Sequence, residues 1–160
     1  MLATVGSRRP REAGFTLTEL MVTLLIGAIL LSIAVPSYTS QMRKSRRTEA
    51  RAALLDLATR EERFLSLNNA YTNSSKNLGY STADTPVSNQ VVGSGYYQIT
   101  VPAPTAAGAA TAAIFTATAT PVAGKSQAND AQCASFTVAS SGMQSSVDAN
   151  GNTTTAACSN

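Results

Sequence analysis

The hydrophobic and polar positions divide the chain into an apolar run, an amphipathic stretch and a mostly polar remainder. The run at residues 15–35 contains one charged side chain, Glu19. As an α-helix it would be about 30 Å long, which matches the hydrocarbon thickness of a bilayer. It is longer than the core of an ordinary secretory signal, and no cleavage site with small residues follows it. The pattern therefore predicts a membrane-spanning helix, for which an uncleaved single-span anchor is the simplest interpretation.

The amphipathic stretch begins after Pro36, which removes a backbone donor and is expected to kink or loosen the helix. Beyond it, apolar residues recur at steps of three and four in a stripe that one acidic residue interrupts. The stripe consists of Ala50, Leu54, Leu57, Glu61 and Phe64 or Leu65. One helix from Phe15 to Leu67 would be about 80 Å long. A domain of this size cannot bury that length, so the front half must protrude into a bilayer or other subunits.

Local signals refine this helix. Asp56 and Arg60 are spaced i,i+4, and Arg46 and Glu49 are spaced i,i+3, so both pairs are predicted to form ion pairs on the helix surface. Residues 68–69 are both asparagine, which indicates a helix stop. The helix is therefore expected to end near residue 69.

The remainder of the chain shows the period-two alternation and the β-branched or aromatic content of short strands. The candidate strands are residues 96–101, 113–119, 134–138 and 143–147. Residues 141–142, Ser-Gly, suit a tight turn between the last two strands. An antiparallel meander laid on the amphipathic half of the helix would bury one face of each. The sequence thus predicts an α+β fold, with a long N-terminal helix packed on a small antiparallel β-sheet head.

Five regions follow from these patterns, and charge is unevenly distributed among them. They are a polar leader at 1–14, a hydrophobic helix at 15–38, the amphipathic helix half at 39–69, a polar loop region at 70–94, and the sheet with the C-terminal cysteines at 95–160. The 160 residues carry a net charge of +3, and ten of the twelve basic residues lie in the leader or between Arg43 and Arg63. The front half is basic, and the back half is nearly neutral.

Arg43, Arg47 and Arg51 are spaced i, i+4, i+8 and would form a basic ridge on one helix face. Like charges at this spacing are mildly destabilising. A solvated face, or contact with acidic groups of neighbouring subunits or lipids, explains such a ridge. The alternative is contact with a polyanion such as the phosphates of DNA. No aromatic residue interleaves the ridge, so base stacking is not indicated there.

Composition excludes several kinds of chemistry. The chain has no histidine, so histidine-based triads and histidine-ligated zinc sites are excluded. Two cysteines cannot make a four-cysteine metal site. A calcium-like start at Asp148 lacks the glycine and glutamate of such a loop, since Thr153 and Ser159 occupy those positions. We therefore expect neither an enzyme nor a metal or cofactor site.

Glu19 is the anomaly of the apolar run. A carboxylate inside a membrane span costs roughly 2.5–3.5 kcal/mol at the centre, and such residues indicate function. Arg11 is two helical turns away and is a poor partner. A free amine at position 15 would supply the positive charge if the chain were cut between Gly14 and Phe15.

Residues 14–20, Gly-Phe-Thr-Leu-Thr-Glu-Leu, lie between a short basic leader and the apolar run. This segment resembles the class III signal peptide of type IV prepilins. The resemblance implies that a prepilin peptidase cuts after Gly14 on the cytoplasmic side and methylates the new N-terminal Phe15. It implies that Glu19 is the glutamate at the fifth mature position, and that Pro36 is the flexible point of the long helix. Later segments, such as 95–97 and 115–121, resemble the PilE-like subgroup, which includes minor pilins.

Cys133 and Cys158 enclose the last predicted hairpin. In an oxidising compartment they should pair, which would stabilise the fold by roughly 3 kcal/mol. The alternative is two buried thiols in a cytosolic protein, which the membrane span disfavours. A disulfide-bounded C-terminal region is also implied by the resemblance to pilins.

The resemblance implies a subunit, major or minor, of a type IV pilus that serves twitching motility, adhesion or DNA uptake. The expected partners are other pilin subunits, the prepilin peptidase and methyltransferase, the inner-membrane assembly platform and, in one alternative, DNA. We expect a single-pass inner-membrane protein that later joins an extracellular pilus (fimbrium). Two alternatives stay open at this point: a pseudopilin of a type II secretion system, and a minor pilin that binds DNA or a surface.

Overall fold

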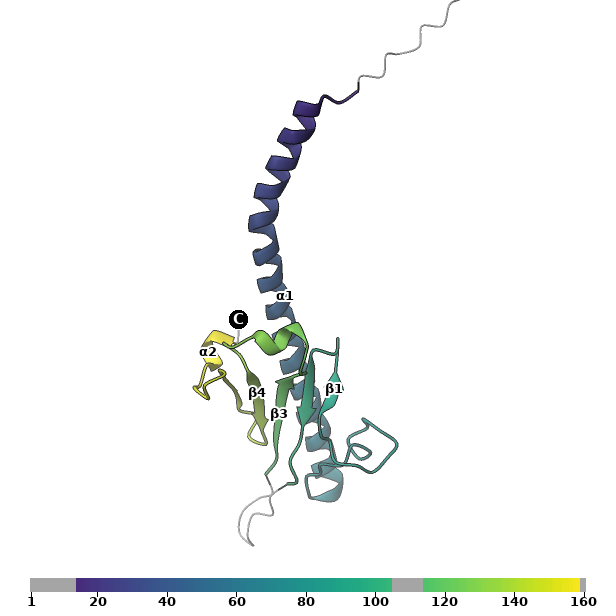
Figure 1. Ribbon diagram of the computed structural model, residues 1–160. Helices are drawn as coiled ribbons and strands as arrows, with labels where there is room; N and C mark the ends of the chain where they lie inside the picture. Colours follow the sequence, from purple (N-terminus) through teal and green to yellow (C-terminus); the bar gives the residue numbers. More distant parts are fainter. Residues whose placement is uncertain (1–13, 105–113, 159–160) are drawn as a thin grey trace, which may run out of the picture. The chain divides into compact units, whose positions relative to one another are not determined.

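The computed structural model describes residues 14–104 and 114–158 and contains one long helix and one sheet (Figure 1). The elements, in chain order, are α1 (Leu17–Asn68), β1 (Gln90–Val92), β2 (Tyr97–Thr100), β3 (Thr116–Pro121), the 3-10 helix η1 (Ser126–Asn129), β4 (Ser135–Ala139), β5 (Gln144–Val147) and α2 (Thr155–Cys158). The chain divides into two compact units, Met1–Thr39 and Ser40–Asn160. The predicted α+β class, with a long N-terminal helix and a small antiparallel sheet, is confirmed.

Within the first unit, the start of α1 is fixed by a local cap. The Thr16 hydroxyl accepts a hydrogen bond from the Glu19 backbone N–H at 3.2 Å, so a Thr-x-x-Glu sequence begins the helix. The hydroxyls of the apolar run bond locally: Thr23 and Ser32 donate to the carbonyls of Leu20 and Ile29, and the Thr16 and Thr18 hydroxyls bond each other at 3.1 Å. These bonds leave the outer surface of the run apolar, as a lipid-facing helix requires.

The assigned helix continues through Pro36. The Thr39 hydroxyl donates to the Pro36 carbonyl at 2.9 Å, close to the point where proline removes an N–H from the helix ladder. A kink at Pro36 stays a prediction. The stop predicted at residues 68–69 is confirmed, because Asn69 has φ +53° and its N–H donates to the Leu65 carbonyl. Asparagine tolerates this left-handed conformation, which commonly ends helices.

The second unit contains the sheet, a five-stranded antiparallel meander in the order β1-β2-β3-β4-β5 (Figure 1). One row of paired residues runs from Ile99 through Ala119 and Phe136 to Ser146, and all four are buried. Burial alternates along β2, β3 and β4, so one sheet face packs inward. The predicted hairpin turn is also present, with Gly142 at φ +76° between β4 and β5.

The inward face of the sheet packs against the half of α1 that lies in this unit. The apolar residues of the predicted stripe, Ala50, Leu54 and Leu57, are all buried in this core. The other buried apolar residues come from the sheet and the loops around it: Leu78, Val87, Tyr97, Ile99, Val101, Phe115, Ala117, Ala119, Cys133, Phe136, Val138 and Cys158. Every member belongs to the second unit, so this core is built without the apolar run.

Three features differ from the sequence-based prediction. The strand β1 lies inside region 70–94, which polarity predicts to be a loop, and it forms because β2 provides a pairing edge. The strand predicted at 113–119 begins at Thr116 and extends to Pro121, while Ala113 lies outside the described residues. The connection after β3 contains η1, and the C-terminal segment contains α2. These short elements carry little periodic signal, which explains why the sequence does not reveal them.

Cys133 and Cys158 form a disulfide, as the sequence predicts for an oxidising compartment. Both cysteines are buried, and the bond ties the connection just before β4 to α2. The bond therefore restrains the C-terminal segment, which has only one turn of helix of its own.

A buried ion pair joins α1 to the connection between η1 and β4. Arg47 donates from Nε and Nη2 to the two carboxylate oxygens of Asp130, each at 2.7 Å. Gln127 donates from Nε2 to Asp130 and to the Tyr97 hydroxyl. All four residues are buried, and burial raises the pKa of Tyr97 to about 12. The network therefore satisfies a buried carboxylate from two elements at once.

Arg47→Ala should destabilise a soluble fragment that begins at Met42 by about 3–5 kcal/mol, because it leaves the Asp130 charge buried without its partner. Asp56→Ala is the matched control: it removes the exposed Asp56–Arg60 pair and should cost less than about 1 kcal/mol. Urea unfolding followed by circular dichroism measures both. A loss below about 1 kcal/mol for Arg47→Ala would show that the buried pair does not hold the helix.

Candidate functional site

The apolar run of α1 is almost fully exposed in the isolated chain. No residue of its most apolar stretch is buried, and Phe15, the first residue of the run, is 83% exposed. The helix is long and apolar enough to cross a membrane. Glu19 is also exposed, in the first turn of α1, where the positive end of the helix dipole favours a carboxylate. This segment needs an apolar environment that its own fold does not supply.

Gly14 lies just before this helix and is exposed. A Cβ atom built at Gly14 meets no other atom within 4 Å, and the residue does not adopt a positive φ. The fold of the chain therefore does not itself demand glycine at this position. A requirement for glycine here would have to come from a molecule that acts on the chain.

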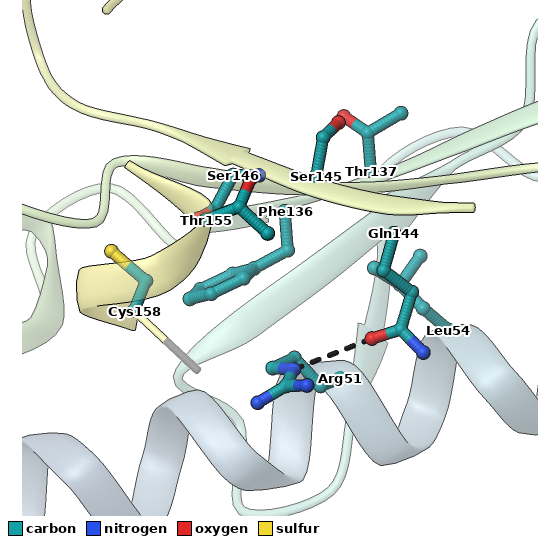
Figure 2. A pocket seen from close by; sticks show the side chains of 9 residues that line it. All are labelled: Arg51, Leu54, Phe136, Thr137, Gln144, Ser145, Ser146, Thr155 and Cys158. Carbon is teal, nitrogen blue, oxygen red and sulfur yellow. Dashed lines mark hydrogen bonds between the residues drawn. The ribbon is translucent and has the colours of Figure 1, made fainter. Parts of the chain in front are cut away.

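The structure does not form the basic ridge that the sequence predicts. Arg47 is buried and paired with Asp130, so it cannot contact a polyanion, and that part of the prediction is wrong. Arg51 is partly buried and donates from Nε to the Gln144 side chain at 3.3 Å (Figure 2). Arg43 is exposed. The i, i+4, i+8 spacing places the three residues near one face, but Asp130 binds Arg47 and Gln144 of β5 binds Arg51.

Two other cations gather around Tyr96 instead. The Arg46 guanidinium carbon lies 3.5 Å from the centroid of the Tyr96 ring, and Arg46 donates from Nη1 to the Ser126 hydroxyl at 2.9 Å. Lys125 Nζ lies 5.9 Å from the same centroid. We call Arg46, Tyr96 and Lys125 the Tyr96 cluster. The sequence does not reveal it, because its members are far apart along the chain.

The predicted Arg46–Glu49 ion pair is absent. Glu49 instead accepts hydrogen bonds from the backbone N–H and the hydroxyl of Ser94, in the turn between β1 and β2. That turn approaches the helix closely: a Cβ atom at Gly93, whose φ is +54°, would overlap a Glu49 carboxylate oxygen. Because Glu49 is bound to Ser94, it does not pair with Arg46, and the Arg46 guanidinium lies over the Tyr96 ring instead. By contrast, the predicted Asp56–Arg60 pair is present at 2.8 Å.

Neither of two hollows lined by described residues resembles a catalytic site. The first, lined by Arg51, Leu54, Phe136 and six other residues, has a volume of about 20 Å³, enough for a single water molecule (Figure 2). The second is an open groove of about 300 Å³ beside Arg60, Arg63 and Leu67. Neither lining contains a carboxylate that could act as a general base. Within residues 14–104 and 114–158, no three acidic or cysteine side chains are grouped to hold a metal ion.

One buried acid lies where α1 meets the following loop. Glu61 is fully buried, and one of its oxygens accepts a hydrogen bond from the Thr72 N–H at 3.1 Å. Its other oxygen has no hydrogen-bond partner, and neither does the buried Tyr80 hydroxyl. Burial is the main cause that raises the pKa of Glu61 to about 7, and the neighbouring Glu62 carboxylate adds to it. Tyr71 and Tyr80 are the other titratable groups that interact with Glu61.

Comparisons with known proteins agree with this architecture. Residues 36–137 match the family described as type IV minor pilin ComP, DNA uptake sequence receptor, and residues 9–35 match the prokaryotic N-terminal methylation motif. The type IV major pilin protein PilA of Myxococcus xanthus strain DK1622 is 35% identical over 76 residues, which is 48% of this chain. The chain spans 34% of the length of that relative.

The match at residues 36–137 covers more than half of the chain, so the protein belongs to the family of ComP-type type IV minor pilins. It is a type IV pilin with a class III signal segment followed by an apolar N-terminal helix. That segment and helix anchor it in the membrane before it enters an extracellular pilus. The pilin families are structural proteins.

The buried acid predicts how the stability of the fragment from Met42 varies with pH. The pKa of Glu61 is about 7 in the fold and about 4.5 when unfolded, so the fold prefers the protonated carboxyl. The contribution of Glu61 to the free energy of unfolding is therefore greatest below pH 4.5, falls as pH rises to 7, and then stays level, with a total loss of about 3 kcal/mol. Glu61→Gln should remove most of this dependence and stabilise the fragment at pH 8.

Urea unfolding between pH 4 and pH 8 measures this dependence. Glu62→Gln is the matched control, since Glu62 is exposed and its substitution should leave most of the dependence in place. A wild-type curve and a Glu61→Gln curve with equal slopes would contradict the assignment.

Proposed function

We propose that this protein is a structural pilus subunit whose N-terminal helix is processed at Gly14 and packs in the filament core through Phe15 and Glu19. The observation that carries this proposal is the exposed apolar run of α1, which begins at the candidate cleavage point and contains one charge. A long apolar surface of this kind is stable only in lipid or against other apolar helices. The prepilin peptidase, neighbouring pilin subunits and the inner-membrane assembly platform are the corresponding partners.

Processing at Gly14 is supported by the local structure. Gly14 is exposed and precedes the first turn of α1, so a peptidase can reach its backbone without unfolding the helix. The fold leaves room for a larger side chain there, which makes the peptidase the source of the glycine requirement. Cleavage creates a new amine on Phe15, one helical turn before Glu19.

The pairing of these two charges explains how helices could find their axial register. An unpaired charge in an apolar core costs several kcal/mol, and this cost is largely offset when an ammonium and a carboxylate meet. Apolar side chains alone give little positional guidance, because many offsets bury similar areas. We therefore assign Glu19 of one subunit to the Phe15 ammonium of a neighbouring subunit.

We also propose that the head of the pilin binds DNA. The matched family is described as a DNA uptake sequence receptor, and this chain carries exposed cations that form no salt bridge with another described residue, among them Arg43, Lys44 and Lys125. Phosphates attract such groups over long distances and release counterions when they bind. This observation favours a DNA-binding pilin over a pseudopilin of a secretion system, for which the chain offers no specific feature. An enzymatic role finds no support in the lining of either hollow.

Glu19→Ala should permit cleavage after Gly14 but sharply reduce incorporation into filaments, because the Phe15 ammonium loses its partner. Mass spectrometry of membranes and of sheared filaments reports the mature N-terminus, its methylation and the amount assembled. Thr23→Ala is the matched control, since Thr23 lies one turn further on and bonds only within its helix. Normal incorporation of Glu19→Ala would count against the charge pairing, and a mature chain that still begins at Met1 would overturn the cleavage site.

The purified protein should bind duplex DNA with an affinity that falls steeply as salt rises, because the contacts replace counterions on phosphates. Gel-shift titrations over a salt series measure the slope. A disulfide-reduced sample is a useful control, since loss of the Cys133–Cys158 bond should loosen the C-terminal segment without changing the charge. If the oxidised protein shows no salt-dependent binding, the DNA part of the proposal fails, while the structural role is unaffected.

A further inference from the structure

Three elements of the second unit bring the Tyr96 cluster together. Arg46 comes from α1, Tyr96 directly precedes β2, and Lys125 directly precedes η1. The Arg46 guanidinium is held over the ring at 3.5 Å and tied to the Ser126 hydroxyl. A guanidinium fixed in this way has lost much of the rotamer freedom that a surface arginine normally keeps, so it is ready to bind before any ligand arrives.

The cluster carries positive charge that no neighbouring carboxylate balances. In the described part of the chain the salt bridges join Arg47 to Asp130 and Arg60 to Asp56, and neither involves Arg46 or Lys125. The nearest carboxylate along the helix, Glu49, is bound to Ser94. Two like charges within 6 Å of one ring repel each other, and an anion between or beside them would relieve that repulsion.

The surroundings extend this charge. Arg43 and Lys44 precede Arg46 by one turn or less of α1, and both are exposed. Arg43 is three residues from Arg46 and therefore lies on the same side of the helix. Arg47, by contrast, is turned inward to Asp130. The exposed cations therefore form a short basic surface at the Tyr96 cluster, in place of the ridge along α1 that spacing alone predicts.

We propose that the Tyr96 cluster, with Arg43 beside it, is the surface that contacts the phosphate backbone of DNA; this inference rests on the proposed DNA-binding function. The hydrogen bond to Ser126 uses one of the five N–H donors of Arg46, and phosphate oxygens are suited to the others. Lys125 acts as a second, more mobile point charge. Because Arg46 covers one face of the Tyr96 ring, the ring positions the arginine and does not stack on bases.

This geometry predicts contacts that position DNA without reading its sequence, since phosphate contacts carry no base information. Sequence preference would have to come from other parts of the head. An alternative occupant of the cluster is a carboxylate of a neighbouring subunit in the filament, and that occupant would make filament yield, not DNA affinity, depend on Arg46 and Lys125.

The test uses the full-length mature protein in detergent micelles and a short fluorescein-labelled DNA duplex, with affinity measured by anisotropy over a salt series. The double variant Arg46→Gln/Lys125→Gln should bind more weakly, and its slope of log affinity against log salt should be shallower by about 2, one for each removed contact. Arg63→Gln/Lys76→Gln is the matched control: it removes the same charge from two exposed residues outside the cluster and should leave the slope nearly unchanged.

Two single variants separate charge from positioning. Tyr96→Leu keeps every charge but removes the ring under Arg46, so it should weaken binding while the slope changes by less than in the double variant. Arg46→Lys keeps the charge but loses the planar donor set, and it should bind with intermediate affinity. Urea midpoints equal to that of the wild type confirm that each variant is folded.

The outcomes distinguish the inference from the function on which it rests. Wild-type protein that does not bind DNA overturns both. Wild-type protein that binds, with equal losses in the cluster variant and in the control variant, shows that net charge alone attracts DNA and overturns the assignment to the Tyr96 cluster. Unchanged DNA binding with reduced filament yield in Arg46→Gln/Lys125→Gln would instead assign the cluster to a contact between subunits.

Discussion

The buried pair between Arg47 and Asp130 is the interaction on which the head depends. It joins the helix to the connection between η1 and β4, and Gln127 donates from Nε2 both to Asp130 and to the Tyr97 hydroxyl. A bidentate pair of this kind tolerates little displacement, so it fixes the helix in rotation as well as in position. Once Arg47 faces inward, its neighbour Arg46 must point in another direction. The contact between Arg47 and Asp130 therefore explains why Arg47 is buried in an ion pair while Arg46 lies against the Tyr96 ring.

The two halves of the helix obey different physical demands. The second half packs against the sheet through Ala50, Leu54 and Leu57. The core that these residues form with the sheet contains no residue of the apolar run. The apolar run satisfies its own hydroxyls and presents an apolar surface, which only lipid or other helices can cover. A pilin needs both properties in one chain, because it is first a membrane protein and later a filament subunit.

Packing against the sheet and its turns determines which charged side chains of the head remain accessible to a partner. Ser94, in the turn after β1, donates a hydrogen bond to the Glu49 carboxylate, and Gly93 leaves room for this close approach. Arg51 is partly buried and donates to Gln144 of β5. The cations that remain accessible near the start of the head include the exposed Arg43 and Lys44 and the half-buried Arg46 beside Tyr96. The basic surface is therefore a product of the packing of acidic side chains against turns, and its charge cannot be read from the count of basic residues alone.

The amino-acid sequence by itself determined the apolar run, the glycine, phenylalanine and glutamate at its start, the long helix to residue 68, most strands and the pairing of the two cysteines. These are local or periodic signals: an uninterrupted apolar length, alternation, a turn glycine, and a choice of only two thiols. Only the tertiary structure decided that Arg47 is buried, that Glu49 turns to Ser94, and that Arg46 and Lys125 meet at one ring. Those outcomes depend on contacts between residues far apart along the chain, such as the 83 positions from Arg47 to Asp130 and the 45 from Glu49 to Ser94. Helical spacing cannot say which of several arginines on nearly the same face will meet a buried carboxylate.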